Sequence, residues 1–453
     1  MKQKIIPFVS VCAALAVSGQ QSALAAEKQK PANVLLILAD DCSYYDISCF
    51  GSKNTKTPNI DKIAEDGIKF NNAYNSASMS VPTRHSLYTG LFPIKHGGYP
   101  NHSQVKPDVK SMPHYLGDLG YRVGIAGKLH IKPLENFPFE MVPGFVENCV
   151  SNDPSYTTDG IEEFMSRDKD QPFCLVLASI NPHMPSTGGD ASVFDRSKLV
   201  LPPYFVDTKE TRERYARYLA EVNLLDQEVG DAVNILKKHG LYENTLVIFM
   251  SEQGSQFAGA KWSNWNAGVK SAMVASWPQV IKPGAETDAL IQYEDVLPTI
   301  IEQAGGKKVK KLDGISFLKL LKGQTDKHRK YAYHVHNNVP EGPAYPIRAI
   351  SDGKYRLIWN LTPEAEYIEK HIERADWFIS WKKQKSKHAE FVMNRYKNRP
   401  EFELYDVEND PIEFNNLMGS VGHEKTFKRL HKELQKWMKS QGDLGVEMDK
   451  PVK

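Results

Sequence analysis

The sequence predicts an α/β fold, with a large and mainly parallel sheet flanked by helices and a smaller C-terminal α+β subdomain. Short, continuously apolar runs recur with helical segments between them, as is typical of parallel strands buried on both faces. From about residue 331 the apolar pattern instead alternates, which is typical of antiparallel strands.

The first element is a leader segment. Lys2 and Lys4 precede an apolar stretch that is too short to span a bilayer, and Ala23-Leu24-Ala25 forms an A-x-A cleavage site. We therefore expect residues 1–26 to be a signal peptide and the protein to be periplasmic or secreted. No later segment is long and apolar enough to cross a membrane, so membrane insertion is not expected.

A catalytic α/β domain is expected over residues 27–335. Its strand candidates are NVLLIL (33–38), YRVGIA (121–126), FCLVLASI (173–180) and TLVIFM (245–250). Between them, Thr57 and Pro58 begin a short helix that Gly67 ends. A long helix is expected from about residue 212 to 238, because its apolar residues form one stripe.

The C-terminal α+β subdomain is expected over residues 336–453. IRAIS (347–351) and YRLIWNL (355–361) alternate in the manner of antiparallel strands, and a final helix is expected near residues 425–440.

Composition is that of a globular enzyme, with 41% hydrophobic and 25% charged residues. Lys and Arg number 57 against 55 Asp and Glu, which leaves no basic excess for nucleic acid, so nucleic acid is not an expected partner. The cysteines beyond the leader fit neither a CxxC pair nor a zinc ribbon. The sequence leaves open whether Cys42 and Cys49 form a disulfide.

Polar residues follow each strand candidate of the main sheet. In chain order they are Asp40 and Asp41, then Lys128 and His130, then His183, then Glu252 and Gln253. Any one of them could be an ordinary turn or surface residue. Because parallel sheets bind ligands beyond the carboxyl ends of their strands, their convergence on one edge predicts a functional site.

One stretch raises the question of whether a serine caps a helix or carries chemistry: SVPTRHSLYTG, from Ser80 to Gly90. With NVLLILADD, GKLH, NPHMP and TLVIFMSEQG…KW, in this order, it resembles the signature of the type I sulfatases, which share the alkaline-phosphatase-like fold. Two further segments, LPPYFVDTKETRERYARYLAEVNLLDQEVG and YPIRAISDGKYRLIWNL, look most like the N-sulfoglucosamine sulfohydrolase (sulfamidase) branch.

The resemblance implies that Ser80 is oxidised to Cα-formylglycine, whose aldehyde hydrates to a gem-diol. One hydroxyl attacks sulfur, and the other expels sulfate as the aldehyde re-forms. Serine at this position is typical of the bacterial serine-type subset, which implies a radical S-adenosylmethionine maturation enzyme as a partner before export.

The resemblance also implies a divalent cation, held by Asp40, Asp41, Glu252, Gln253 and the modified Ser80. An all-oxygen set suits Ca²⁺, with Mg²⁺ as the smaller competitor. The family usually has Asp-Asn or Asp-His where this chain has Glu252-Gln253. Both side chains are one methylene longer, but the order of acid and amide is kept.

Five catalytic roles follow by motif position. Arg84, on the same helical face as Ser80, would steady the alkoxide, and Lys128 and Lys261 would neutralise sulfate oxygens. His130 would bond the gem-diol and assist its collapse, and His183 would be the general acid for the leaving group.

The expected substrate is a terminal sulfated glucosamine or N-acetylglucosamine of glycosaminoglycan or mucin-type glycans, cleaved at an N-sulfate or an O-sulfate ester. The candidates for sugar recognition are His85, His336, Asn338 and Arg348, each of which could equally be a structural loop residue. Two other functions are considered: a phosphomonoesterase or phosphodiesterase of the same fold, and a non-catalytic glycan-binding relative. The signature through Gly90 disfavours the first, and retention of the catalytic residues disfavours the second.

Overall fold

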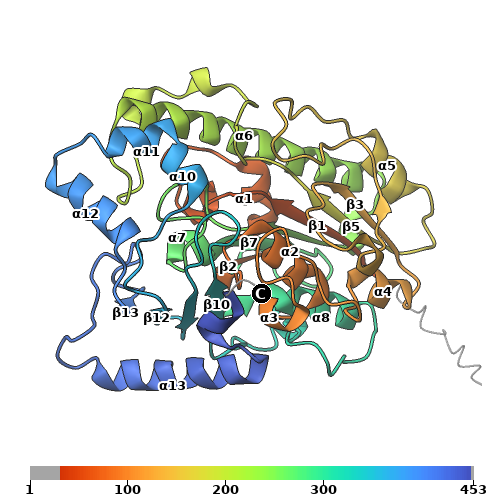
Figure 1. Cartoon of the computed structure of the whole chain (residues 1–453). Helices are drawn as coiled ribbons and strands as arrows, with labels where there is room; N and C mark the ends of the chain where they lie inside the picture. Colours follow the sequence, from red (N-terminus) through yellow and green to blue (C-terminus); the bar gives the residue numbers. More distant parts are fainter. Residues whose placement is uncertain (1–30, 450–453) are drawn as a thin grey trace, which may run out of the picture. The chain divides into compact units, whose positions relative to one another are not determined.

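A computed structural model describes residues 31–449, and its largest element is a nine-stranded sheet (Figure 1). The strands are β1 (Asn33–Ala39), β2 (Ile68–Tyr74), β3 (Arg122–Gly127), β4 (Glu140–Met141), β5 (Phe173–Ala178), β6 (Thr245–Ser251), β7 (Lys270–Ser276), β8 (Ala285–Thr287) and β9 (Ile291–Gln292). The signal peptide predicted over residues 1–26 lies outside the described residues.

The order of the strands is β4-β3-β5-β1-β6-β7-β2-β8, and β9 also pairs with β2. Every pair is parallel except the two that β7 makes with β6 and β2. In the middle of the sheet, Leu36 of β1 is opposite Val176 of β5 and Ile248 of β6. The predicted fold class, a mainly parallel sheet in an α/β protein, is confirmed.

Helices cover both faces of this sheet, and further helices belong to the C-terminal part of the chain. The helices are α1 (Pro58–Glu65), α2 (Ser80–Thr89), α3 (Pro93–His96), α4 (Met112–Gly117), α5 (Asp159–Ser166), α6 (Lys209–Lys238), α7 (Asn266–Val269), α8 (Val296–Gln303), α9 (Leu318–Leu321), α10 (Lys370–Arg374), α11 (Asp376–Trp381), α12 (Lys387–Lys397) and α13 (Glu424–Gln441). The two long helices predicted over 212–238 and 425–440 correspond to α6 and α13, and the short one over 57–67 corresponds to α1.

Each face of the sheet has its own hydrophobic core. Leu35 and Ile37 of β1 pack with α1, α5 and α6, whereas Leu36 and Leu38 pack with α2, α4 and α8 on the opposite face (Figure 1). This alternation is the period of two expected for a strand, with both faces apolar because both are covered.

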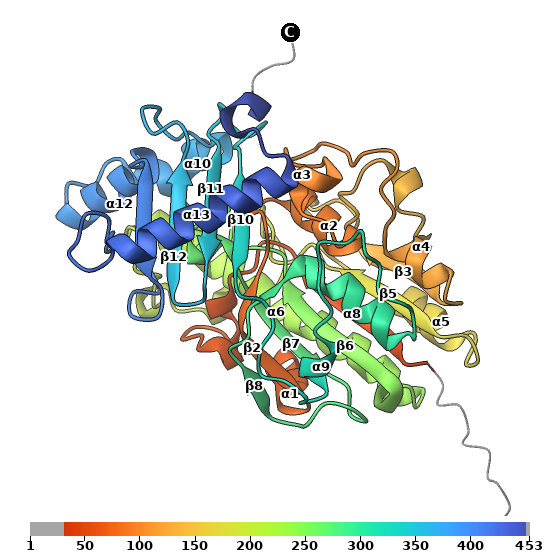
Figure 2. The same cartoon turned by 90° about the horizontal axis from the view of Figure 1, so that it is seen from below.

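A second sheet is antiparallel, in the order β10 (Ala332–His336), β11 (Ile347–Ser351), β12 (Tyr355–Asn360) and β13 (Phe402–Asp406). Helix α13 runs across it, as Figure 2 shows, and buries Leu430 and Leu434 against Leu357 and Leu404. This small sheet begins at Ala332, four residues before the predicted subdomain boundary at 336, because β10 pairs with β11.

Two remaining expectations concern membrane insertion and disulfides. Within residues 31–449 no helix has the length and apolar character that a membrane span needs. The structure also shows Cys42 and Cys49 as free thiols, so the disulfide that the sequence left open is not formed.

Candidate active site

The carboxyl edge of the main sheet brings the predicted residues together. Asp40 and Asp41 directly follow β1, Lys128 follows β3, and Glu252 and Gln253 follow β6. Backbone hydrogen bonds between neighbouring segments continue past the ends of the strands. The Asp40 N–H donates to the Asn181 carbonyl at 3.0 Å, and the Glu252 N–H donates to the Ala39 carbonyl at 2.8 Å. Parallel pairing therefore continues into the loops and holds their side chains in register.

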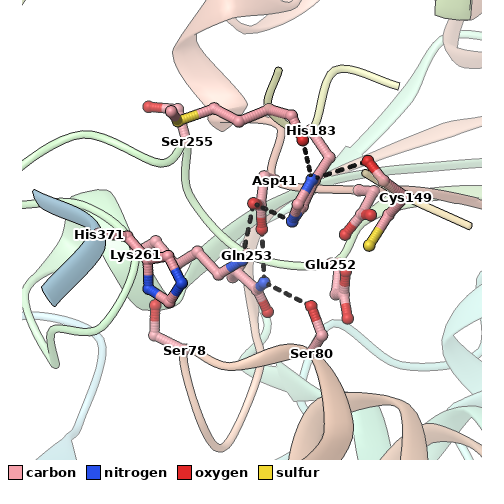
Figure 3. A network of polar contacts seen from close by, with 12 residues as sticks. Asp41, Ser78, Ser80, Cys149, His183, Glu252, Gln253, Ser255, Lys261 and His371 are labelled. Atoms are coloured by element: carbon pink, nitrogen blue, oxygen red, sulfur yellow. Dashed lines mark hydrogen bonds and ion pairs between the residues drawn. The ribbon is translucent and has the colours of Figure 1, made fainter. Parts of the chain in front are cut away.

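Ser80 opens helix α2 but does not cap it. The cap position is Met79, and Ser80 Oγ instead accepts hydrogen bonds from Lys128 Nζ at 3.2 Å and Gln253 Nε2 at 3.3 Å. All ten residues of α2 are buried, and the helix ends at Gly90, whose φ of 67° is the left-handed conformation that favours glycine. The serine hydroxyl is thus directed at the strand-end residues (Figure 3).

Three fully buried carboxylates meet beside this hydroxyl. One oxygen each of Asp40, Asp41 and Glu252 lies within 4.8 Å of the other two. Three like charges this close in a dry site are unfavourable unless cations balance them. The shortest ion pairs are Asp40 Oδ2–Lys128 Nζ at 2.6 Å, Asp41 Oδ2–Lys261 Nζ at 2.7 Å and Glu252 Oε1–Arg84 Nε at 3.0 Å. Arg84 Nη2 is also 3.7 Å from Asp40 Oδ1, and Lys128 Nζ is 4.0 Å from Glu252 Oε2.

These pairs set the direction of the pKa values. Burial raises the pKa of Asp41, but the facing cationic groups, Lys261 first, outweigh it and leave that pKa below the usual value. Burial also raises the pKa of Glu252, and there Arg84 offsets only part of the effect.

The oxygen atoms around this cluster fit a divalent cation. Within residues 31–449, Asp40 Oδ1 and Gln253 Oε1 are buried acceptors with no hydrogen-bond donor, although Arg84 Nη2 lies 3.7 Å from Asp40 Oδ1. Buried acceptors without a donor are costly, and a cation bound between them would offset that cost. Carboxylate and amide oxygens are the ligands of Ca²⁺ and Mg²⁺. The Gln253 side chain is longer than the one usual at this position, and it still reaches the carboxylate cluster. Its amide nitrogen is 2.7 Å from Asp41 Oδ1. Rotation of the amide by half a turn would exchange its nitrogen and oxygen.

Arg84 acts on Glu252 in this structure. Its Nε and Nη2 donate to the two oxygens of that carboxylate at 3.0 and 3.2 Å, and its Nη1 donates to the Lys128 carbonyl at 3.0 Å. Such a bidentate pair fixes both side chains. The Arg84 guanidinium is therefore directed at Glu252, a candidate metal ligand. Its predicted role in steadying the alkoxide at Ser80 stays a prediction.

His183 is held by carbonyl groups. Its Nδ1 is 2.6 Å from the Met184 carbonyl oxygen and 3.1 Å from that of Cys149. A carbonyl only accepts, so Nδ1 carries the hydrogen and Nε2, which is 3.5 Å from Asp41 Oδ2, keeps its lone pair. Burial lowers the pKa of His183 to about 3, against the opposing effect of Asp41.

His130 pairs with a histidine that the sequence analysis did not single out. Its Nε2 is 3.0 Å from Nδ1 of His102, and burial, followed by the charges of Lys128 and Arg84, lowers the pKa of His130 to about 2. Both histidines have positive φ, as do Asp41 and Trp262 nearby. Left-handed backbone at non-glycine residues costs about 1–3 kcal/mol each and is held by surrounding contacts, typically at functional sites.

Ser80, Lys128, His130, His183 and Lys261 line a cavity of about 810 Å³, which is the size of a small-ligand site, and we call these five residues its floor. The other residues that line the cavity form its wall and are both polar and apolar. The polar wall residues include Asn101, His102, Glu341, His371 and Arg374, and the apolar ones include Val150, Met184, Pro185 and Trp262. The Trp262 and His371 rings stack with centroids 5.8 Å apart.

The four residues predicted to recognise the sugar are not among those that line this cavity, and their role in sugar recognition stays a prediction. Each is buried and bonded elsewhere. His85 Nε2 accepts the Lys132 N–H at 3.0 Å, His336 Nε2 is 3.2 Å from the Tyr367 hydroxyl, Asn338 donates to two backbone carbonyls, and Arg348 is paired with Asp443. Three of these side chains keep a buried polar atom without a partner among the described residues: His85 Nδ1, His336 Nδ1 and Asn338 Oδ1.

Glu341 lines the cavity, although its sequence position was not a candidate for the site. It follows Asn338 in the same Pro- and Gly-interrupted loop and is only 4% exposed. Asn101 donates to Oε1, whereas Oε2 is buried with no donor among the described residues. The loop was recognisable from its composition, but which of its side chains turns toward the cavity depends on the path of the backbone.

Comparison with known proteins adds an independent line of evidence. The family model described as Sulfatase matches residues 32–306, and the one described as N-sulphoglucosamine sulphohydrolase, C-terminal, matches residues 261–376. An ulvan-active sulfatase of Formosa agariphila is 34% identical over 92% of this chain and 81% of its own length. The human N-sulphoglucosamine sulphohydrolase is 27% identical over 95% of this chain and 93% of its own length.

The solved structures show the same fold. One protein, solved in complex with its substrate D-glucosamine-2-N,6-O-disulfate, superposes with a TM-score of 0.69. The superposition covers 92% of this chain and 99% of that one, at 20% sequence identity.

Proposed function

Because this chain belongs to the sulfatase family, and is thereby a hydrolase of sulfate esters or sulfamates, we propose that it is an exported carbohydrate sulfatase acting on a terminal sulfated glucosamine or N-acetylglucosamine. The observation that carries this proposal is the geometry at Ser80. Its hydroxyl is within 3.3 Å of both Lys128 and Gln253, beside three buried carboxylates and at the floor of the cavity.

Two groups complete this site in our proposal. Asp40, Asp41, Glu252 and Gln253 would hold Ca²⁺, and Ser80 would be converted to formylglycine. When bound, the cation supplies Lewis-acid polarisation of a sulfate oxygen, and the modified residue supplies a nucleophile that is regenerated in each cycle.

The charge of the chain's own side chains suits an anionic substrate. Three carboxylates face three cations, Arg84, Lys128 and Lys261, so these six groups sum to zero. A divalent cation would make the floor positive by about two charges, which attracts a sulfate group. Lys128 and Lys261 are the cations that also line the cavity, so we assign them to the sulfate oxygens.

His183 and His130 are the proton-handling groups in this proposal. His183 lines the cavity, and its Nδ1–H is held by the Met184 and Cys149 carbonyls, which leaves Nε2 free to exchange a proton with the leaving group. Sulfate bound nearby would favour the protonated ring, because a negative charge raises the pKa of a histidine. His130, on the same wall, would exchange its proton with the nucleophile.

A sulfated glucosamine is supported by the C-terminal part of the chain. The family model for the C-terminal region of N-sulphoglucosamine sulphohydrolase spans Lys261, Trp262, Glu341 and His371, which all line the cavity. We assign sugar recognition to this wall. Glu341, whose Oε2 has no donor among the described residues, would accept a hydrogen bond from a ring hydroxyl or amine.

The function is tested with matured, calcium-loaded protein on an aryl sulfate, the matching aryl phosphate and a panel of N-, 3-O- and 6-O-sulfated glucosamines. We expect turnover of the sulfates, with at least one sulfated sugar preferred over the aryl sulfate. Faster turnover of the phosphate would instead indicate a phosphoesterase, and binding without turnover a glycan-binding protein.

The sugar wall is tested by Glu341→Gln, with Glu366→Gln as the matched control, since Glu366 pairs with Lys397 at the surface. Weakening a buried contact of this kind costs about 1–3 kcal/mol, or roughly ten- to a hundredfold in kcat/KM. We expect this loss on the sulfated sugar and little change on the aryl sulfate. An equal loss on both substrates would remove Glu341 from sugar recognition.

A further inference from the structure

We propose that the active-site cavity contains a second cation site, formed by Cys149, His183 and Asp40 and selective for a thiophilic divalent ion such as Zn²⁺. This site is chemically distinct from the all-oxygen calcium site proposed above, although the two share Asp40.

The three ligand groups already lie close together. Cys149 Sγ, a ring nitrogen of His183 and a carboxylate oxygen of Asp40 all lie within 4.8 Å of one another. Atoms that bind one zinc ion at about 2.0–2.3 Å lie less than about 4.5 Å apart, so small side-chain rotations complete the site. Figure 3 shows Cys149 beside His183, and both residues line the cavity, which gives an ion access from solvent.

The groups around these ligands orient them toward a shared position, although His183 Nε2 is also 3.5 Å from Asp41 Oδ2 and Asp40 Oδ2 is 2.6 Å from Lys128 Nζ. His183 Nδ1 is bonded to the carbonyls of Met184 and Cys149, so Nε2 presents its lone pair, as in metal sites where a carbonyl orients the histidine ligand. Asp40 Oδ1 is buried without a hydrogen-bond donor among the residues that the structure describes, and its nearest cationic group is Arg84 Nη2 at 3.7 Å. The thiol of Cys149 is half-buried and forms no disulfide.

The ligand types determine which ion binds. Thiolate, imidazole and carboxylate are the usual ligands of zinc, and three of them leave a fourth position for water. Ca²⁺ binds oxygen and does not prefer sulfur. As the sulfur–zinc bond forms, the thiol releases its proton to the buffer, and no oxidation or reduction takes place.

Occupation of this site should inhibit the enzyme reversibly. Zinc would take the lone pair of His183 and one oxygen of Asp40. The inhibition rests on the roles proposed for these residues, whereas the binding rests only on their geometry.

Binding is tested with Co²⁺, added to matured protein in excess Ca²⁺. A thiolate ligand gives cobalt a charge-transfer band in the near ultraviolet, which oxygen and nitrogen ligands alone do not. We expect one equivalent of Co²⁺ to produce this band in the wild type and in Cys49→Ser, whose half-buried thiol is not part of any metal-ligating cluster of the described residues. Cys149→Ser and Cys149→Ala should lack it, and both keep the backbone carbonyl that orients His183. Absence of the band in the wild type, or its persistence in folded Cys149 variants, would overturn the proposal.

Inhibition is measured separately, as the zinc concentration that halves each variant's own rate. We expect this concentration to be at least tenfold higher in the Cys149 variants than in the wild type and Cys49→Ser, and a chelator followed by Ca²⁺ should restore activity. The same zinc sensitivity in all variants would contradict the site. A cobalt band without zinc inhibition would support the site and contradict the catalytic roles of His183 and Asp40, so the two proposals fail separately.

Discussion

Arg348→Ala should destabilise the protein without selectively lowering turnover of the sulfated sugar. The guanidinium donates to both carboxylate oxygens of Asp443, at 2.5 Å from Nε and 2.8 Å from Nη2, and both side chains are 0% exposed. Nη1 also donates to the Tyr99 hydroxyl at 3.0 Å. The pair links strand β11 to the residues just after α13, so it connects the small sheet to the end of the chain.

The expected size of the effect follows from this burial. Removing one partner leaves Asp443 as an unpaired buried charge, which costs about 3–5 kcal/mol. Unfolding entropy near the melting temperature is about 2.1 cal/mol/K per residue, or about 0.9 kcal/mol/K for a chain of roughly 420 residues. The melting temperature should therefore fall by about 3–6 °C.

The assay is thermal and urea unfolding, together with kcat/KM for a sulfated sugar and an aryl sulfate well below the melting temperature. Arg348→Met combined with Asp443→Leu should regain most of the stability, because apolar residues of similar volume leave no unpaired charge. Lys428→Ala is the matched control, since its ion pair with Glu424 is exposed. Unchanged stability of Arg348→Ala, with turnover lost only on the sugar, would refute this reasoning and return Arg348 to sugar recognition.

Two further predictions concern the metal and pH. Asp41→Ala removes a proposed calcium ligand and the carboxylate that Lys261 and Gln253 contact. Calcium affinity should therefore fall at least about a hundredfold, and activity should fall with it. Unchanged calcium binding by calorimetry would exclude Asp41 as a ligand. Burial raises the pKa of Glu228 on α6 to about 8, above the 4.5 expected when unfolded, so the folded state binds more protons and stability should decrease as pH rises from about 4.5 to 8. Between pH 6 and 8, the melting temperature of Glu228→Gln should therefore fall by less than that of the wild type. Equal decreases would show that Glu228 does not titrate in this range.

Sequence reasoning located the floor of the site because its signals are local. A continuous apolar run identifies a parallel strand, and the residue that follows each run must lie at the carboxyl edge of the sheet. Asp40, Lys128 and Glu252 converge for that reason, and the family resemblance to sulfatases is confirmed by the comparisons. The roles assigned to these residues remain proposals.

The residues that we propose for sugar recognition could not be located in the same way. His336 and Arg348 are on strands of the small sheet, where alternation places a side chain on one face or the other, and both turn into the fold. Glu341 and His371 reach the cavity from a loop and a short helix, elements without a periodic pattern. Cys149 is likewise brought beside His183 by the path of a loop, so spacing alone did not mark it.

The most direct test of the account is the chemical state of Ser80 measured beside activity. The protein is produced with and without a serine-type radical S-adenosylmethionine maturation enzyme, and the peptide that contains Ser80 is analysed by mass spectrometry. We predict that sulfatase activity appears only with maturation and in proportion to the fraction of peptide that has lost the mass of two hydrogen atoms at Ser80. Full sulfatase activity from protein in which Ser80 is entirely unmodified would contradict the account.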